Sequence, residues 1–162
     1  MDIKLKKTSE LPEPYKLFTC IEKDNDFAAL LESVEGPEHI ARYSIVAWGK
    51  KEWVYGKSNS THGTIVTDFY DPVEVFDKLI SASPLLELPG KYKGGPIGYV
   101  SYDTVRYWER IKDLKPPHEE WPDFEFFVPE NVIVYDHYQE NAYIYGEDFS
   151  QSCEPSRGFK AK

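Results

Sequence analysis

Apolar and polar residues alternate over short runs through most of this chain, a pattern typical of β-strands. Two hairpins are expected, one over residues 41–56 that turns near Gly49 and one formed by the last two strands, which turn through residues 139–141. Tyr, Phe and Trp make up 15% of the chain, and strands favour such residues. The predicted strands are 27–33, 41–48, 52–55, 96–102, 124–128, 131–136 and 141–146.

Helices are predicted at three places. Pro14 falls in the first turn of a helix over 14–22, where its missing N–H costs nothing. Asp71 is a predicted N-cap, with Pro72 at the first helical position. A third helix is predicted over 104–111, capped by Asp103. The second helix shows apolar residues at helical spacing, namely Val73, Phe76, Leu79 and Ile80. The elements together predict an α+β fold, mainly antiparallel sheet with about three helices.

Polar segments without periodicity divide the chain. Residues 1–12 are expected to be a loose lead-in, and residues 57–64 a polar loop. Residues 150–162 are expected to be a tail or a linker to an absent domain. Because the chain has 162 residues, its length predicts one domain, over 13–149.

Charge narrows the possible partners. The formal net charge is −9, which argues against nucleic acid and against anionic membrane surfaces, since both attract basic patches. No apolar stretch is long enough for a membrane span, and the N-terminus has no apolar signal region. We therefore expect a cytoplasmic protein. The scarcity of Gln, Asn and Met beside abundant Glu and Lys is a feature of thermophilic proteins.

The two cysteines, Cys20 and Cys153, lie far apart and form no CxxC pair. Their number predicts neither a disulfide scaffold nor a zinc site. Cys20 stands among apolar residues and is predicted to be a buried small hydrophobe.

No active site is predicted in this chain. His118-Glu119-Glu120 and Asp136-His137 contain metal-ligating or acid–base groups, but their spacing supplies no third converging ligand. His137 is interpreted as a histidine at the end of a strand. The cluster Gly94, Gly95 and Gly98 lacks the Lys-Ser/Thr of a P-loop, so these glycines are predicted to permit close backbone packing or a bulge. Catalytic residues and metal ligands are therefore both predicted as none.

One segment offers groups that suit a free amino acid. Leu30-Leu31-Glu32-Ser33 ends an apolar run, and Ser44 follows after ten intervening residues. The carboxylate of Glu32 and the hydroxyls of Ser33 and Ser44 can form charge-assisted hydrogen bonds with an ammonium group. The alternative is a buried strand ending in a turn, in which Ser33 bonds its own backbone.

This segment resembles the tryptophan-sensing motif of anthranilate synthase component I. Three further segments resemble the same family in the same order: Arg42–Ile45 (RYSI), Gly94–Arg106 (GGPIGYVSYDTVR) and the stretch from Pro122-Asp123 to Pro129–His137. The resemblance covers roughly residues 14–146 and identifies the chain as similar to the anthranilate synthase / aminodeoxychorismate synthase component I family. It implies the N-terminal part of that family's sandwich fold.

The resemblance also implies a function. The larger enzymes of the family convert chorismate and an amino donor to anthranilate and pyruvate, use Mg²⁺, and receive ammonia from a glutamine amidotransferase subunit. Their chorismate site and magnesium ligands lie mainly in a C-terminal chorismate-binding domain, which we expect to be absent from this chain and supplied in cis or in trans. No cofactor is expected within the chain itself. Tryptophan is the implied effector, bound by Glu32, Ser33 and Ser44 with Leu31 as an apolar wall.

The apolar strand residues are expected to form the face that meets the absent domain: Ile45, Val46, Trp48, Ile97, Tyr99, Ile133, Val134 and Tyr135. Three hypotheses remain open. The chain is a non-catalytic N-terminal part of anthranilate synthase component I, or the equivalent part of aminodeoxychorismate synthase, or a free-standing amino-acid-binding module. The first is preferred because four segments agree.

Overall fold

The structure is a computed structural model that describes residues 3–32, 42–57, 60–65, 71–90, 92–110, 121–149 and 153. Its fold is α+β, as predicted, and every strand pair in the described residues is antiparallel. The elements are β1 (Lys4–Lys7), η1 (Thr8–Glu10), α1 (Pro14–Ile21), β2 (Ala28–Leu31), β3 (Tyr43–Trp48), β4 (Glu52–Lys57), β5 (Ser60–Gly63), α2 (Pro72–Ala82), β6 (Ile97–Val100), η2 (Tyr102–Tyr107), β7 (Phe124–Val128), β8 (Asn131–Asp136) and β9 (Asn141–Tyr145). The chain divides into two compact units, which we describe separately.

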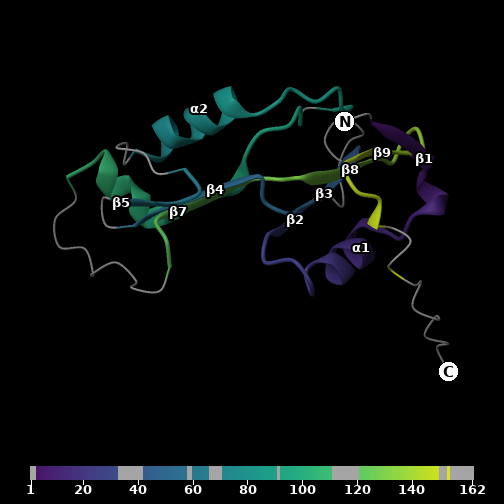
Figure 1. The fold of residues 1–162 in the computed structure, drawn as a ribbon, viewed down its shortest axis with the longest axis horizontal. Coiled ribbons are helices and arrows are strands. Elements are labelled where there is room, and N and C mark those ends of the chain that lie inside the picture. The colour runs from purple at the N-terminus through teal and green to yellow at the C-terminus, as the bar shows by residue number, and fades with distance from the viewer. Residues whose placement is uncertain are drawn as a thin grey trace. The chain divides into compact units, whose positions relative to one another are not determined.

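The first unit lies within residues 1–49, 86–93 and 130–162. It contains a five-stranded sheet in the order β1-β9-β8-β3-β2. Helix α1 lies along one face of this sheet (Figure 1). Strands β3 and β8 are its interior pair, in register from Tyr43 opposite Asp136 to Trp48 opposite Asn131. All of β8 is buried, as expected of an interior strand covered on both faces.

Helix α1 forms where the sequence predicted it. Pro14 stands in the first turn, and Leu17 and Ile21 on the buried side of the helix are fully inaccessible to solvent. The amide of Asn25 donates to the carbonyl oxygen of Ile21 at 2.9 Å and so occupies one of the last carbonyls of the helix. The core beneath the helix contains Leu11, Leu17, Ile21, Val46, Trp48, Ile133, Tyr135, Ala142, Ile144 and Cys153.

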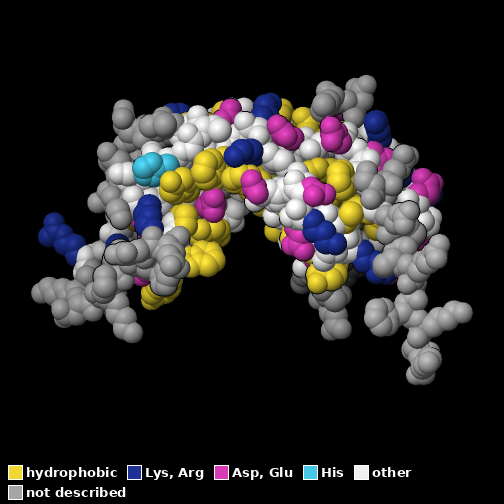
Figure 2. All heavy atoms as spheres, turned by 60° about the horizontal axis from the view of Figure 1, so that its bottom comes forward, with side chains coloured by type: hydrophobic (Ala, Val, Ile, Leu, Met, Phe, Trp, Pro, Cys, Tyr) yellow, Lys and Arg dark blue, Asp and Glu magenta, His cyan; other side chains and the backbone are white. Residues whose placement is uncertain are grey.

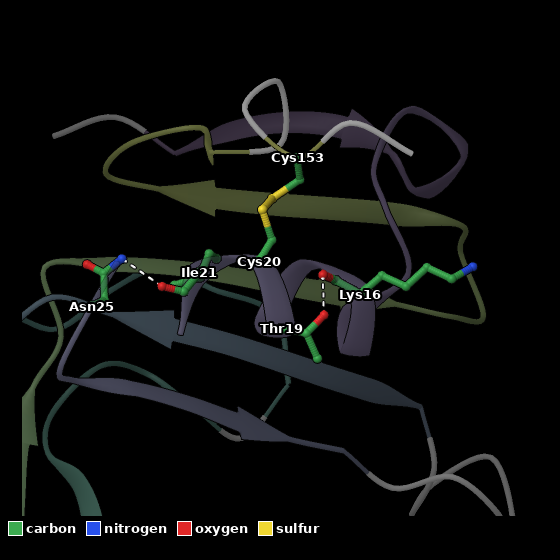
Figure 3. Close-up of a disulfide and its surroundings, with 6 residues drawn as sticks. All are labelled: Lys16, Thr19, Cys20, Ile21, Asn25 and Cys153. Atoms are coloured by element: carbon green, nitrogen blue, oxygen red, sulfur yellow. Dashed lines mark hydrogen bonds between the residues drawn. A yellow bond between two sulfur atoms is a disulfide. The ribbon is translucent and has the colours of Figure 1, made fainter. Parts of the chain in front are cut away.

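A disulfide joins this helix to the end of the chain. Cys20 of α1 and Cys153 are bonded, at a separation of 133 positions in the sequence (Figure 3). The prediction of no disulfide, with Cys20 as a free apolar side chain, was therefore wrong. Cysteine spacing could not predict the pair, because the packing of α1 on the sheet brings the two residues together.

A buried ion pair lies at one end of the paired strands β3 and β8. Asp136 is inaccessible to solvent and accepts hydrogen bonds from Nε and Nη2 of Arg42, the shortest at 2.7 Å. Its Oδ1 also accepts from the backbone N–H groups of Tyr138 and Gln139, both at 3.1 Å. Burial opposes the ionised form, but these bonds to Arg42 and to the two N–H groups outweigh it and hold the pKa of Asp136 below its usual value.

The second unit lies within residues 50–85 and 94–129. Its four-stranded sheet has the order β5-β4-β7-β6, and α2 lies along one face (Figure 1). The predicted N-cap is confirmed, since Oδ1 of Asp71 accepts from the backbone N–H of Val73 at 2.8 Å. The core of this unit contains Val54, Val75, Leu79, Phe124, Phe126 and Val128.

The glycine cluster has the packing role that the sequence predicted. Gly98 lies in β6 opposite Phe126, and a Cβ there would stand 1.9 Å from the carbonyl oxygen of Glu125. Gly94 and Gly95, just before the strand, have φ values of 94° and 95°, which only glycine adopts readily. These glycines therefore shape the entry to β6.

Four local predictions were wrong. Residues 41–56 do not form a hairpin, because β3 pairs with β2 and β8 whereas β4 pairs with β5 and β7. Gly49, with a φ of 74°, leads the chain from one sheet into the other. The predicted loop at 57–64 contains strand β5, and the predicted lead-in contains β1 and η1. In the third predicted helix, Asp103 lies inside the 3₁₀ turn η2 instead of capping an α-helix.

The predicted apolar face is largely internal. Six of its eight residues are buried, which leaves Ile45 half-buried and Tyr99 exposed. Other apolar side chains reach the surface (Figure 2). In the second unit these include Val100, Tyr102, Trp108 and Trp121. No helix in the described residues is long and apolar enough to cross a membrane.

We expect the double variant Cys20→Ser/Cys153→Ser to unfold more easily than the parent protein under oxidising conditions. A disulfide that closes so long a loop restricts the unfolded chain, and its loss costs about 2–5 kcal/mol of unfolding free energy. Urea denaturation with and without a reductant measures the difference. Reductant should lower the parent to the level of the variant and leave the variant unchanged. Equal stability of the two oxidised proteins would contradict this assignment.

We expect Asp136→Asn to lower the unfolding free energy by about 1.5–3 kcal/mol near neutral pH, because a hydrogen-bonded charge is lost. The folded-state pKa of Asp136 is lowered, so its contribution is present above the unfolded pKa and is lost as pH falls through the folded pKa. The parent should therefore lose more stability than the variant below about pH 4. Urea melts at a series of acidic pH values test this, and parallel pH profiles would disprove the role.

Candidate functional site

Three side chains of the first unit meet at one end of the sheet, one from β3 and two from just beyond the ends of β2 and β8. Oγ of Ser44 lies 2.7 Å from Nε2 of His137 and donates to Oε1 of Glu32 at 3.4 Å. Ser44 is fully buried, whereas Glu32 and His137 are both exposed. The buried hydroxyl therefore links an exposed carboxylate to an exposed imidazole.

Strand register explains this meeting. Ser44 pairs with Tyr135, so the two side chains share a face of the sheet. His137 follows Tyr135 by two positions and keeps that face, with the two rings stacked at a centroid distance of 6.4 Å. On the other side, Leu30 pairs with Val46 and packs towards the core beneath α1, and Glu32 follows two residues later. Alternation along three neighbouring strands thus places all three groups on the α1 side.

Of the four predicted effector residues, two are in contact, one is directed to the opposite face of the sheet, and one lies outside the described residues. The structure brings Glu32 and Ser44 together. Leu31 pairs with Ile45 and is 44% exposed, so alternation directs it to the opposite face of the sheet. Ser33 lies outside the described residues. The role of Leu31 as an apolar wall of the effector site therefore stays a prediction. Alternation directs its side chain to the face of the sheet opposite to that of Glu32.

A cavity of about 440 Å³ adjoins the site. His137 forms part of its wall together with Lys7, Glu13 and Glu140. Tyr135 also lines it, and its hydroxyl donates to the carbonyl oxygen of Pro12 at 2.9 Å. Burial, followed by the charge of Asp148, raises the pKa of the Tyr135 hydroxyl well above its usual value. The phenol is therefore a neutral donor that ties the segment before α1 to β8.

The groups at this site can bind a charged ligand. Glu32 offers a negative charge to a cationic group, and Ser44 supports that carboxylate from the protein interior. Asp136 is fully engaged by Arg42 and the following turn, so it is not available as a base for the neighbouring His137. Within the described ranges no three His, Cys, Asp or Glu side chains converge as metal ligands. The predicted pieces His118-Glu119-Glu120 fall outside those ranges.

His137 is the residue that the sequence interpretation missed. Its place after the apolar run 131–136 predicts only a histidine at the end of a strand. A usable signal was present, because His137 directly follows the predicted strand 131–136 and has the same parity as Tyr135. Only the pairing of β8 with β3 shows that Ser44, 93 positions away from His137, is the partner.

Comparisons with known proteins agree with this fold. The model of the chorismate binding enzyme family matches residues 27–161. Anthranilate synthase component 1 of Saccharolobus solfataricus is 45% identical over 137 residues, which cover 84% of this chain and 30% of that protein. Anthranilate synthase component 1 of Acetivibrio thermocellus is 30% identical, over 84% of this chain and 29% of that protein. Aminodeoxychorismate synthase component 1 of Bacillus subtilis is 35% identical, over 71% and 25%.

A solved structure supports the fold independently. The crystal structure of anthranilate synthase component I from Streptococcus pneumoniae TIGR4 superposes with a TM-score of 0.53 at 24% identity, over 78% of this chain and 28% of that one. The chain spans about 30% of the length of the curated relatives it matches. The match to the family model covers most of the chain, and so the chain belongs to the family of chorismate binding enzymes.

Proposed function

We propose that this chain is the N-terminal regulatory part of an anthranilate synthase component I and that it holds the tryptophan feedback site of that enzyme. One observation carries the proposal. Glu32, just after β2, and Ser44 of β3 are the effector residues of the sequence motif, and a hydrogen bond of 3.4 Å joins them. The 45% identity to the Saccharolobus anthranilate synthase component 1 supports the choice of enzyme.

The exposure of each residue suggests its role. Glu32 is exposed and takes the ammonium group of tryptophan through a charge-assisted hydrogen bond. Ser44 has no surface that a ligand can reach, so it holds the Glu32 carboxylate from behind. The sequence interpretation had paired Ser44 with the ligand directly. Ser33 remains a proposed ligand of the effector.

The reaction of the complete enzyme is a further part of the proposal. Chorismate and ammonia give anthranilate, pyruvate and water, with ammonia supplied by a glutamine amidotransferase subunit. The complete enzyme would use Mg²⁺, but the described residues offer no set of three carboxylate, histidine or cysteine ligands for it. The model of the chorismate binding enzyme family matches residues 27–161 of this chain. That the chorismate site lies in a further domain therefore stays a prediction. A cytoplasmic location likewise remains a proposal.

A second candidate rests on the Bacillus subtilis relative. The chain is 35% identical to that aminodeoxychorismate synthase component 1, over 71% of its length. The equivalent part of such an enzyme is therefore the alternative function. The product formed by the complete enzyme, anthranilate or aminodeoxychorismate, distinguishes the two candidates.

We expect the chain alone to consume no chorismate. The described residues hold no group of three His, Cys, Asp or Glu side chains that could bind the metal ion of the complete enzyme. Anthranilate fluorescence with chorismate, Mg²⁺ and ammonium measures turnover, with the complete enzyme as the positive control. Turnover clearly above a protein-free control would show that the chain holds a chorismate site of its own.

We expect Glu32→Gln in the complete enzyme to weaken inhibition by tryptophan roughly tenfold or more, since one hydrogen bond to a charged group is lost. Ser33→Ala should have a similar effect. The rate without tryptophan should stay unchanged because both residues are proposed to contact the effector and not chorismate. Inhibition constants from initial rates at several tryptophan concentrations provide the measurement.

The matched control for that experiment is Glu22→Gln, which removes an exposed carboxylate just after α1 in the same unit. It should leave tryptophan inhibition at the parental value. Unchanged inhibition in Glu32→Gln, with normal folding, would remove the site assignment.

A further inference from the structure

The contacts of Ser44 fix the direction of two hydrogen bonds. A serine hydroxyl has one proton to donate, and an ionised carboxylate only accepts. The hydroxyl must therefore give its proton to Glu32 if the 3.4 Å contact is a hydrogen bond. The 2.7 Å contact with His137 can then be made only if Nε2 of the imidazole carries a proton and donates.

We propose that His137 is a positioning residue of the effector site. It donates from Nε2 to Ser44 and thereby directs the hydroxyl proton of Ser44 to Glu32. This inference rests on the proposed function, because the Glu32 carboxylate is taken to be the group that receives the effector ammonium. The relay runs from an exposed imidazole through a buried hydroxyl to an exposed carboxylate.

The opposite arrangement would work against the site. If Nε2 lacked its proton, the shorter contact would take the proton of Ser44. The hydroxyl oxygen would then present only lone pairs to Oε1 of Glu32, and two acceptors at this distance repel each other. The same three residues thus either hold the carboxylate or push it away, and the donor on His137 decides between the two states.

The ring of His137 lies at the surface, among charged side chains. His137 is exposed and forms part of the wall of the 440 Å³ cavity, where Lys7 of β1, Glu13 before α1 and Glu140 of the β8–β9 turn are the charged neighbours. The backbone N–H of His137 donates to the carbonyl of Arg42 at 3.0 Å, which fixes the residue on the end of β8. Solvent reaches the ring, yet Nε2 faces a buried partner.

Nuclear magnetic resonance of the whole ¹⁵N-labelled chain tests the proton position without any ligand. At about pH 8, where an ordinary imidazole is neutral, we expect the His137 ring to carry its proton on Nε2. The exposed His62 of β5, which stacks on Tyr55 in the second unit, is a matched reference assigned through His62→Gln. In Ser44→Ala the preference of His137 should weaken. A proton on Nδ1, with Nε2 bare, would overturn the proposal.

Variants in the complete enzyme test the consequence. His137→Gln keeps an N–H donor, so tryptophan inhibition should stay within about twofold of the parent. His137→Leu removes the donor and should weaken inhibition about two- to tenfold. His137→Glu can only accept, takes the proton of Ser44, and should weaken inhibition at least as much as the leucine variant. The rate and the KM for chorismate without tryptophan should not change.

The outcomes separate this inference from the proposed function. If Glu32→Gln leaves inhibition unchanged, the effector site itself fails, and the positioning role of His137 fails with it. If Glu32→Gln weakens inhibition but His137→Leu does not, only the inference about His137 fails. Equal losses in His137→Gln and His137→Leu would show a steric role instead of a donor. If the leucine variant does not fold, the comparison of the glutamine and glutamate variants, which are nearly isosteric, still decides.

Discussion

The buried carboxylate of Asp136 is the constraint on which the first unit depends. An isolated charge in a protein interior is very unfavourable, so Asp136 must be satisfied by the groups around it. It is, by the guanidinium of Arg42 before β3 and by two N–H groups of the turn after β8. The pair therefore fixes the register of the two interior strands at the end where the candidate site lies.

The site follows from that register. A shift of β8 by one residue against β3 would exchange the faces of its side chains and carry His137 away from Ser44. Because Asp136 immediately precedes His137, and Arg42 stands two residues before Ser44, the ion pair aligns the relay without touching it. The Glu32 end depends instead on β2, which pairs with β3 from Ala28 to Leu31.

Much of the fold could be predicted from local sequence signals. Pro14 and the Asp71-Pro72 pair marked two helices, and alternating apolar runs marked most strands, because caps and periodicity act over a few residues. Strand β1 was missed because Lys4–Lys7 has little apolar character and gains its hydrogen bonds from β9, far along the chain. The same limitation concealed the true partners of β3 and β4.

The candidate site could be predicted only in part, for the same reason. Glu32 and Ser44 could be named because a local motif contains them both. His137 and the Cys20–Cys153 disulfide could not, since each partner comes from a distant segment that only tertiary packing brings near. The occurrence of disulfides also depends on the kind of organism and on the cellular compartment. Disulfides are rare in the cytosol of mesophiles but common within the cells of hyperthermophiles, and a composition poor in Gln and Met points the same way.

Feedback requires that an effector bind one state of the enzyme better than another. The relay offers a physical basis for such a difference. Ser44 lies on β3, an interior strand with partners on both sides, whereas Glu32 follows β2, which is an edge strand of the described sheet. An edge strand is held by one ladder of hydrogen bonds and moves at lower cost than an interior one. The contact between Glu32 and Ser44 therefore joins a fixed element to a less constrained one. An effector that bridges Glu32 to the rest of the enzyme would stabilise one position of β2, and the relay through His137 would keep the carboxylate ready in that position.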